Sequence, residues 1–240
     1  MSNLYDDKKA LAVLAHDIKG PLSSVIDLLS IIDRGYVTDP VKSKQLISRA
    51  ISKASTLIKM VDDILDFSKL ENKSLMKKEK VDIFSILEES IKMMRPYAEK
   101  RDIKIERCDF CKHKEYVNGN YTFLLRAFNN VIMNAIKYNN KDGKIVFDSF
   151  RDKKEKNIVL NITDTGIGIS KEDLTKVFLI FERGSNARRN IDGSIGLGLS
   201  LVKQIVEDHE GSIEISSTLN IGTTIIITLP IYNEGENNEL

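Results

Sequence analysis

The sequence lacks any apolar run approaching the roughly 18 residues that span a bilayer, so we expect no membrane contact within the chain. It also lacks a basic segment at its start, where Asp6 and Asp7 stand instead, which argues against a signal peptide and favours a cytoplasmic location. An excess of one charge is absent as well: the formal net charge of the 240 residues is +1, and the basic residues are dispersed without interleaved aromatic residues. We therefore expect no nucleic-acid partner.

Cysteine is scarce. Cys108 and Cys111 are spaced C-x-x-C, and His113 follows two residues later. These three side chains fall short of the four ligands of a structural zinc site, and the sequence has no second pair of cysteines. We interpret the pair as two reduced thiols in a hairpin; a redox pair or part of a metal site is the alternative.

Residues 1–70 carry apolar side chains at helical spacing, which predicts two long helices. The first helix is expected from about Leu4 to Arg34, and the second is expected to begin at Asp39–Pro40. The second carries a heptad seam to about residue 70, widened on one side by Leu57 and Ile64. The seam consists of Ile47, Ile51, Ala54, Ile58, Val61 and Leu65.

Two helices cannot cover so broad an apolar face by themselves. We therefore expect a homodimer through residues 1–70, in which two hairpins form a four-helix bundle. Packing of the stripe against the second half of the same chain is the alternative.

After residue 70 the pattern changes. Residues 71–80 are rich in Lys and Glu and are expected to form a linker, and residues 233–240 an acidic, disordered tail. Between them, residues 81–232 mix helical and β-rich stretches, which predicts a two-layer α/β sandwich. Helices are expected at 85–100, 121–138 and 198–209, and strands at 103–107, 144–150, 157–163, 212–216 and 223–229.

His16 lies inside the first predicted helix, on the face opposite Leu14 and Ile18. A histidine in that position is expected to face solvent rather than to pack in a core. A carboxylate, Asp17, stands beside it. Most histidines on helix surfaces have no function, so the interpretation of His16 depends on the rest of the chain.

The helix expected at 121–138 carries Asn130 and Asn134 on one face, with Lys137 on the next turn. An amide oxygen can ligate Mg²⁺, and an ammonium group can bind phosphate oxygens. By itself the pattern is weak, because helix faces with Asn and Lys are common in sequences rich in Asn.

Two glycine-rich segments follow. Asp164-Thr165-Gly166-Ile167-Gly168 comes directly after a predicted strand, where a carboxylate can accept a hydrogen bond from an exocyclic amine such as that of adenine. Gly196-Leu197-Gly198 opens a predicted helix, whose first amides make an anion site. Either segment alone is equally compatible with a turn. Between them, the polar, aperiodic residues 186–192 predict a mobile lid.

Taken in order, these segments resemble the conserved boxes of the sensor histidine kinases. The resemblance extends over about residues 8–230 and includes His16 to Pro21, Asn130 to Asn134, Asp164-x-Gly-x-Gly, Phe178 to Phe181, and Gly196 to Leu199. It implies a dimerisation and phosphoacceptor domain, followed by an ATP-binding domain of the Bergerat fold that the GHKL ATPases share.

The resemblance also implies a role for each matching residue. His16 would be the phosphoacceptor, with Asp17 as its acid/base partner, and Asn134 would hold Mg²⁺. Asp164 would bind adenine, and Gly166 and Gly168 would give backbone room. The remaining nucleotide-site residues would be Asn130, Lys137 and Tyr138; Phe178 and Phe181, which anchor the lid; Arg183, which reaches the phosphates; Gly196, Leu197 and Gly198; and Thr223 in a last glycine box.

The resemblance implies autophosphorylation of a histidine by ATP with Mg²⁺, followed by transfer to an aspartate in the receiver domain of a response regulator. Gly20 stands where the family usually has Thr or Asn, a residue associated with dephosphorylating the partner, so we expect weak or absent phosphatase function. The input signal is expected to come from a sensor domain outside this sequence or from a partner protein. Phosphorylation within one chain and across the dimer are both open, because the handedness of the turn at residues 35–40 decides between them.

Three alternative interpretations fit the sequence less well. A GHKL-type ATPase would resemble its relatives in placing a water-activating Glu one turn before the metal-binding Asn, where this chain has Asn130. The presence of His16, Asp17, Asn134 and Asp164 argues against a scaffold that binds ATP without transferring phosphate. A coiled-coil interaction protein would not need the glycine-rich segments after residue 160.

Overall fold

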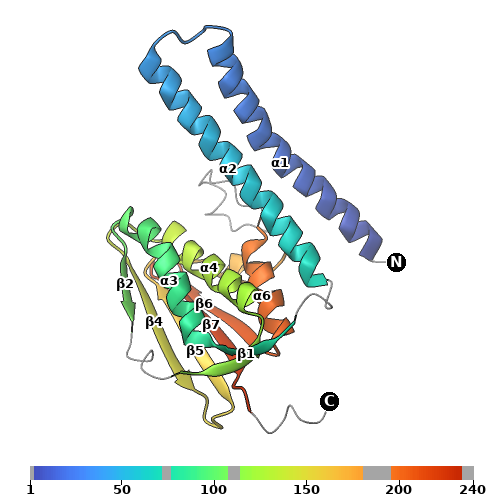
Figure 1. Cartoon of the computed structure of the whole chain (residues 1–240), viewed down its shortest axis with the longest axis vertical. Coiled ribbons are helices and arrows are strands. Elements are labelled where there is room, and N and C mark those ends of the chain that lie inside the picture. Colours follow the sequence, from blue (N-terminus) through green and yellow to red (C-terminus); the bar gives the residue numbers. More distant parts are fainter. Residues whose placement is uncertain (1–2, 72–76, 108–113, 181–195, 234–240) are drawn as a thin grey trace.

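The computed structural model describes residues 3–71, 77–107, 114–180 and 196–233. Within these ranges, side chains are described from Ala15 onward, except at positions 16, 17, 66, 67 and 69–71. The chain forms a long helical hairpin that lies on an α/β domain (Figure 1). This arrangement of a helical hairpin followed by an α/β sandwich is the one predicted from the sequence.

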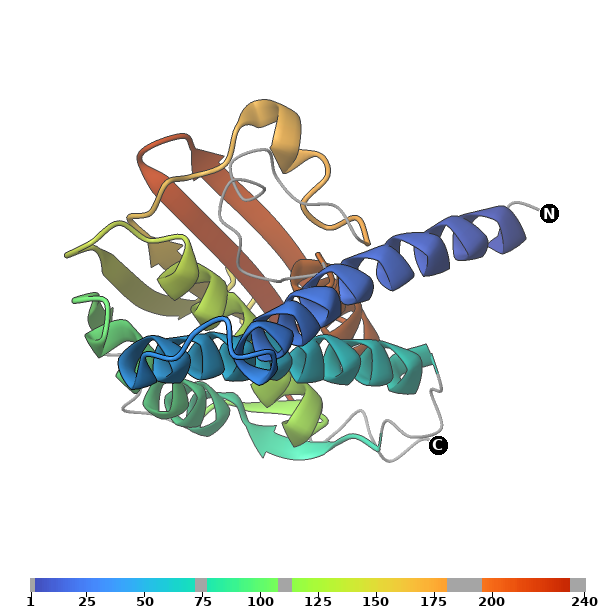
Figure 2. The ribbon, with the colours of Figure 1, turned by 90° about the horizontal axis from the view of Figure 1, so that it is seen from above.

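Helices α1 (Asn3–Asp33) and α2 (Pro40–Glu71) form the hairpin, close to the predicted bounds. Gly35 has a φ of +69°, which lets the chain turn after α1. Asp39 Oδ1 accepts a hydrogen bond from Val41 N at 2.8 Å and so caps the start of α2. Seen from above, the two helices diverge as they leave their connecting loop (Figure 2). None of the described helices combines the length and the hydropathy that crossing a bilayer requires.

A five-stranded sheet and three helices make up most of the α/β domain. The strands lie in the order β2 (Lys104–Arg107), β4 (Lys144–Arg151), β5 (Asn157–Asp164), β7 (Gly222–Pro230) and β6 (Ser212–Thr218). Neighbouring strands are antiparallel except β2 and β4, which are parallel. Helices α3 (Ile83–Glu99), α4 (Tyr121–Lys137) and α6 (Gly198–Asp208) cover one face of the sheet (Figure 1).

The core lies between the sheet and these helices. Alternate residues of β5 are buried there, namely Ile158, Leu160 and Ile162. The opposing face of α4 contributes buried residues at helical spacing, among them Leu124, Phe128, Val131, Ile132 and Ala135. One face of the strand, formed by every second residue, therefore packs against one face of the helix, formed at a spacing of about 3.6 residues. The two layers predicted from the sequence are confirmed.

Three short elements were not predicted. Strands β1 (Glu79–Asp82) and β3 (Tyr116–Gly119) pair antiparallel in a second sheet, and α5 (Lys171–Leu174) is a single helical turn. Because β1 begins at Glu79, the last two residues expected in the linker belong to a strand. Such short elements, whose partners are distant in sequence, carry no periodic pattern.

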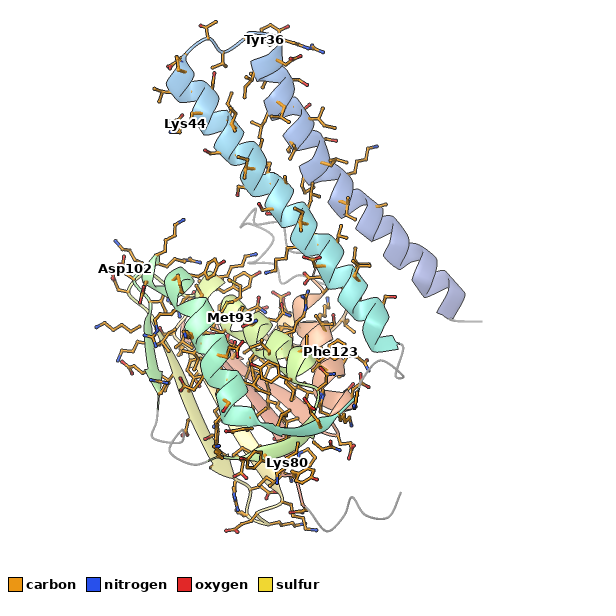
Figure 3. All side chains as sticks on the ribbon, viewed as in Figure 1. Tyr36, Lys44, Lys80, Met93, Asp102 and Phe123 are labelled. Carbon is orange, nitrogen blue, oxygen red and sulfur yellow. The ribbon has the colours of Figure 1, made fainter. Side chains whose placement is uncertain are left out.

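Aromatic rings hold β1 at the end of the domain away from the hairpin (Figure 3). Lys80 Nζ lies 4.9 Å from the ring centroid of Tyr116 and 5.1 Å from that of Tyr232. A cation between two aromatic rings is attracted to both. The strand that follows the linker is thereby attached to the end of the described chain.

His209 is buried after α6, where it contacts the start of α4. Its Nε2 accepts a hydrogen bond from Asn120 N at 2.9 Å, so Nδ1 carries the proton and donates to Ile205 O at 2.6 Å. Asn120 Oδ1 in turn accepts from Phe123 N at 3.2 Å and caps α4. A neutral histidine therefore fixes the beginning of α4, the helix that carries two of the predicted site asparagines.

We expect the chain to lose stability as the pH falls below 6.5. Burial is the main cause that lowers the pKa of His209 below its ordinary value of 6.5; Lys78 lowers it further, while the Ile205 carbonyl, Asp208 and Glu210 raise it. The unfolded state then binds the proton more tightly, so this stability is fully present above pH 6.5 and is lost as the pH falls toward the folded pKa. Protonation breaks the bond from Asn120 N, at a cost of about 1 to 2 kcal/mol.

Urea unfolding at about pH 7.5 and about pH 5.5 measures this loss. His209→Gln serves as the comparison, because an amide side chain does not titrate in this range. The variant should show a shallower pH dependence than the wild-type chain. Identical pH dependence in both chains would show that His209 does not contribute.

Candidate functional site

A cavity of about 600 Å³ lies between α4, the adjoining ends of β5 and β7, the start of α6, and helix α2 of the hairpin. Its walls contain ten predicted site residues from segments far apart in the sequence: Asn130, Asn134, Lys137, Tyr138, Asp164, Gly168, Gly196, Leu197, Gly198 and Thr223. The polar and small residues predicted to bind a nucleotide are thus brought together at one place.

Asn130 and Asn134 lie one turn apart on α4, and both line the cavity. Asn130 Nδ2 donates to Arg126 O at 3.2 Å, which leaves the Asn130 side-chain oxygen for another partner. The Asn134 side-chain amide makes no hydrogen bond with any described residue. Lys137 follows in the last turn, where its Nζ lies 5.3 Å from the Tyr138 ring centroid. Amides and an ammonium group on one wall suit oxyanions and a cation that prefers oxygen ligands.

Asp164 ends β5, opposite Thr223 of β7. Its Oδ1 accepts hydrogen bonds from Gly166 N at 2.8 Å and from Thr223 N at 3.3 Å, which fix the carboxylate. No described residue donates to its Oδ2. Burial raises the pKa of Asp164, although the two amide donors act in the opposite direction. The second carboxylate oxygen is therefore available to an N–H donor in the cavity.

The glycines after Asp164 make room for the protein's own backbone. A Cβ at Gly166 would lie 2.3 Å from Tyr138 O, and one at Gly168 would lie 2.0 Å from Thr218 O. Ile167 between them donates from N to Tyr138 O at 3.0 Å. The resemblance had implied backbone room for these two glycines, and in this structure carbonyl groups of the same chain occupy that space. Gly166 itself does not line the cavity.

Replacing Gly168 by Ala is expected to destabilise the chain by at least about 2 kcal/mol. Gly168 has a φ of +63°, so alanine would require both a strained backbone and displacement of Thr218. Gly20→Ala is the matched control, because a Cβ there meets nothing within 4 Å and Gly20 lies inside α1. That substitution should stabilise the chain by about 0.5 to 1 kcal/mol. Urea unfolding compares the two, and unchanged stability of Gly168→Ala would contradict the steric account.

Helix α6 begins beside the two asparagines. A Cβ at Gly198 would lie 3.5 Å from Asn130 Oδ1 and 3.9 Å from Asn134 Nδ2. Leu197, the N-cap residue, gives the helix no side-chain hydrogen bond. The first amides of a helix lack partners within the helix and attract anions. The wall formed by Asn130, Asn134 and the start of α6 is therefore suited to phosphate groups.

Several predicted residues are not brought to the cavity. Phe178 lies outside its walls, where Lys203 Nζ of α6 is 5.9 Å from its ring centroid. Phe181, Arg183 and the predicted lid at 186–192 lie outside the described residues, as do Cys108 and Cys111. The side chains of His16 and Asp17 are also outside the described part, although both residues belong to α1.

Helix α2 packs against the start of α6. Met60 and Leu197 are each 3% exposed and form an apolar cluster with Leu57 and Ile64. Beside this cluster, Arg126 Nη2 of α4 donates to Asp63 Oδ1 at 2.7 Å. The two residues that widened the predicted stripe therefore pack against the second half of the chain. The seam residues Ile47, Ile51, Ile58, Val61 and Leu65 remain 42–63% exposed on the single chain.

This contact lies at the height of His16 along the hairpin. His16 is 17 residues before the end of α1, and Leu57 is 17 residues after the start of α2. At a rise of 1.5 Å per residue, each lies about 26 Å from the connecting loop. Since the helices run antiparallel, α2 contacts the cavity at the level where α1 carries the histidine.

The contribution of α2 and α3 to the cavity was not predicted from the sequence. Thr56, Lys59, Met60 and Asp63 line it from α2, and Tyr97, Lys100 and Arg101 line it from the C-terminal end of α3. Arg101 Nη1 donates to Lys137 O at 2.7 Å. The signal that the sequence offered was the widening of the stripe on one side at Leu57 and Ile64.

Two family models match the chain. One, described as His Kinase A (phospho-acceptor) domain, matches residues 7–73, and the other, described as Histidine kinase-, DNA gyrase B-, and HSP90-like ATPase, matches residues 119–233. The first covers the hairpin, and the second covers the part of the α/β domain that supplies most of the cavity lining. The chain belongs to the histidine kinases.

The curated relatives that the chain matches are longer than this chain. It is 30% identical over 235 residues to the sensor protein kinase WalK of Staphylococcus aureus, covering 97% of this chain and 56% of that protein. It is 29% identical over 228 residues to drug sensory protein A of Synechocystis, covering 91% of this chain and 34% of that protein. The chain therefore spans between about a third and about half of the relatives it matches.

The fold agrees with a solved histidine kinase structure. The histidine kinase ThkA, in complex with the response regulator protein TrrA, superposes with a TM-score of 0.77. The match covers 96% of this chain and 64% of that chain at 20% sequence identity, so the likeness concerns the fold. The family model of the second half implies ATP binding, and the cavity is where ten of the residues predicted to bind the nucleotide meet.

Proposed function

We propose that this chain transfers the γ-phosphoryl group of ATP to a ring nitrogen of His16 and then passes it to an aspartate in the receiver domain of a response regulator. One observation carries the proposal: the cavity joins ten predicted nucleotide residues and is bordered by α2 at the height of His16. A nucleotide bound there lies against the helical hairpin that carries the histidine.

Asp164 and the cavity wall formed by Asn130 and Asn134 orient the bound nucleotide. The free Oδ2 of Asp164 accepts the exocyclic amine of adenine, while Oδ1 stays bound to the amides of Gly166 and Thr223. The phosphates extend along α4 toward Asn130, Asn134 and the first amides of α6. Lys137 supplies a positive charge on the same wall.

The donor set of the cavity fits Mg²⁺. No group of three or more His, Cys, Asp or Glu side chains in the described residues could hold a metal, so a protein cage is not expected there. Asn134 offers an amide oxygen that no described residue engages, and Mg²⁺ commonly combines few protein oxygens with phosphate oxygens and water. When bound, the ion neutralises phosphate charge, as Lys137 and the α6 amides do from the protein.

The first step forms a bond from a ring nitrogen of His16 to the γ-phosphorus and breaks the bond to the β–γ bridging oxygen, so ADP leaves. The other ring nitrogen releases its proton to Asp17. An imidazole with an unperturbed pKa of about 6.5 is mostly neutral, and therefore nucleophilic, at neutral pH. In the second step, a carboxylate oxygen of the receiver aspartate takes the phosphoryl group and the N–P bond breaks.

The hairpin is the proposed surface for two partners. The exposed seam on α2 supports a homodimer through residues 1–70, because a second hairpin would cover these apolar side chains. The receiver domain would bind the hairpin near His16. ThkA was solved in complex with a response regulator protein, which supports a partner of this kind.

Incubation of the full chain with ATP labelled in the γ-phosphate tests the proposal. We expect label on the protein that is labile in acid and stable in base, which is the behaviour of phosphohistidine. Addition of a receiver domain that accepts the phosphoryl group should move the label to that domain. An acid-stable label, or none, would contradict the proposed reaction.

A further inference from the structure

Helix α2 borders the end of the cavity that lies away from Asp164. Asp164 lies near the C-terminal end of α4, because Gly166 abuts Tyr138 O there. The contact between Asp63 and Arg126 lies 12 residues before Tyr138, near the other end of α4. At a rise of 1.5 Å per residue, the two ends are about 18 Å apart. A nucleotide whose base binds Asp164 therefore directs its last phosphate toward α2.

Lys59 is the cation that α2 contributes to this cavity. It lies next to the buried Met60 and, like Thr56 one turn earlier, lines the cavity wall. No described residue forms an ion pair with Lys59. The contacts made by Met60 and Asp63 fix this part of α2 against Leu197 and Arg126, so Lys59 is held at the phosphate end.

The other basic side chains that line the cavity lie away from Lys59 and belong to the α/β domain. Arg101 donates to Lys137 O and so lies by the C-terminal end of α4, near Asp164. Lys100 precedes it on the same side of the cavity. Lys137 lies on α4 itself, one turn after Asn134. Among the cavity cations in the described part of the chain, Lys59 is therefore the one placed by the hairpin and not by the α/β domain.

We propose that Lys59 binds the terminal phosphate of a nucleoside triphosphate, so that the hairpin completes the nucleotide site and distinguishes a triphosphate from a diphosphate. A diphosphate ends one phosphate short of α2 and loses this contact. By linkage, the triphosphate would then also favour the contact between α2 and the α/β domain. The proposal rests on the proposed function, because it requires that the cavity bind a nucleotide.

Calorimetric titration of the full chain with Mg²⁺ and two probes tests this proposal: a non-hydrolysable ATP analogue and ADP. Lys59→Ala should weaken binding of the triphosphate by about fivefold to tenfold and change ADP binding by less than about twofold. Lys59→Arg should retain most of the preference, because it keeps the charge. Lys53→Ala is the matched control on α2, since Lys53 does not line the cavity, and should affect neither probe.

Equal weakening of both probes, or no change in either, would overturn the role of Lys59. Absence of binding by the wild-type chain would instead contradict the proposed function, so the two failures are distinguishable. Far-UV circular dichroism of each variant confirms that the helices are intact. A change confined to the triphosphate is a result that loss of structure would not produce.

Discussion

Asp164→Asn is expected to weaken ATP binding by about 30-fold to 100-fold, which corresponds to about 2 to 3 kcal/mol. The asparagine oxygen can still accept from Gly166 N and Thr223 N, so the local backbone should remain in place. Its amide nitrogen would then stand where Asp164 Oδ2 stands. A donor would face the donor amine of adenine, and both would be left without a partner at this half-buried position.

Calorimetric titration with ATP measures this loss. Asp148→Asn is the matched control, because Asp148 is an exposed carboxylate on the neighbouring strand β4 and lies outside the cavity. The control should bind ATP like the wild-type chain. If Asp164→Asn also bound ATP normally, the base would have to bind elsewhere.

His16→Gln is expected to remove the acid-labile label completely while leaving ATP affinity within about twofold of the wild-type value. Glutamine resembles histidine in size and polarity but has no nucleophilic ring nitrogen, so the phosphoryl group has no acceptor. The nucleotide residues lie on α4, β5, α6 and β7, far in sequence from His16, so binding should persist. Labelling and titration are therefore measured on the same preparation.

Lys19→Gln provides the comparison for this variant. Lys19 is an exposed residue of α1 only three positions after His16, so the substitution changes a nearby surface charge without removing the acceptor. It should label like the wild-type chain. Label that survives in His16→Gln would place the phosphoryl group on another residue.

The sequence predicted the long elements well because their patterns are local. Helical spacing gave α1 and α2 within a few residues, and Asp39–Pro40 marked the start of the second helix. The mixture of β-rich runs and helical stretches after residue 80 indicated a two-layer sandwich. The pairing of β1 with β3, and the parallel pairing of β2 with β4, depend on residues distant in the chain and left no such signal.

The candidate site was predictable in its chemistry and less so in its boundary. Ten predicted residues line one cavity because helix α4, the adjoining ends of β5 and β7, and the start of α6 pack around it. The role of Gly166 and Gly168 in the structure differs from the predicted one. The absence of side chains at these two positions makes room for Tyr138 O and Thr218 O of the same chain. That difference follows from contacts between segments, which glycine spacing cannot reveal.

The role of α2 in the cavity could not be predicted from its heptad seam. Seam residues and docking residues alternate along the same helix: Ile58, Val61 and Leu65 stay exposed, whereas Leu57, Met60 and Ile64 face the α/β domain. Helix α2 thus packs one apolar face against the α/β domain and leaves the seam residues exposed on the single chain. Only the position of Leu197 and Arg126 shows which residues face the nucleotide cavity.

The most direct test of the central claim follows both products of ATP cleavage in one sample. The full chain is mixed with ATP labelled in the γ-phosphate, and protein-bound label and free phosphate are measured together over time. The account predicts that acid-labile label accumulates on the protein, up to one phosphoryl group per chain, ahead of free phosphate. Steady release of free phosphate from a protein that never carries label would contradict it and identify an ATPase.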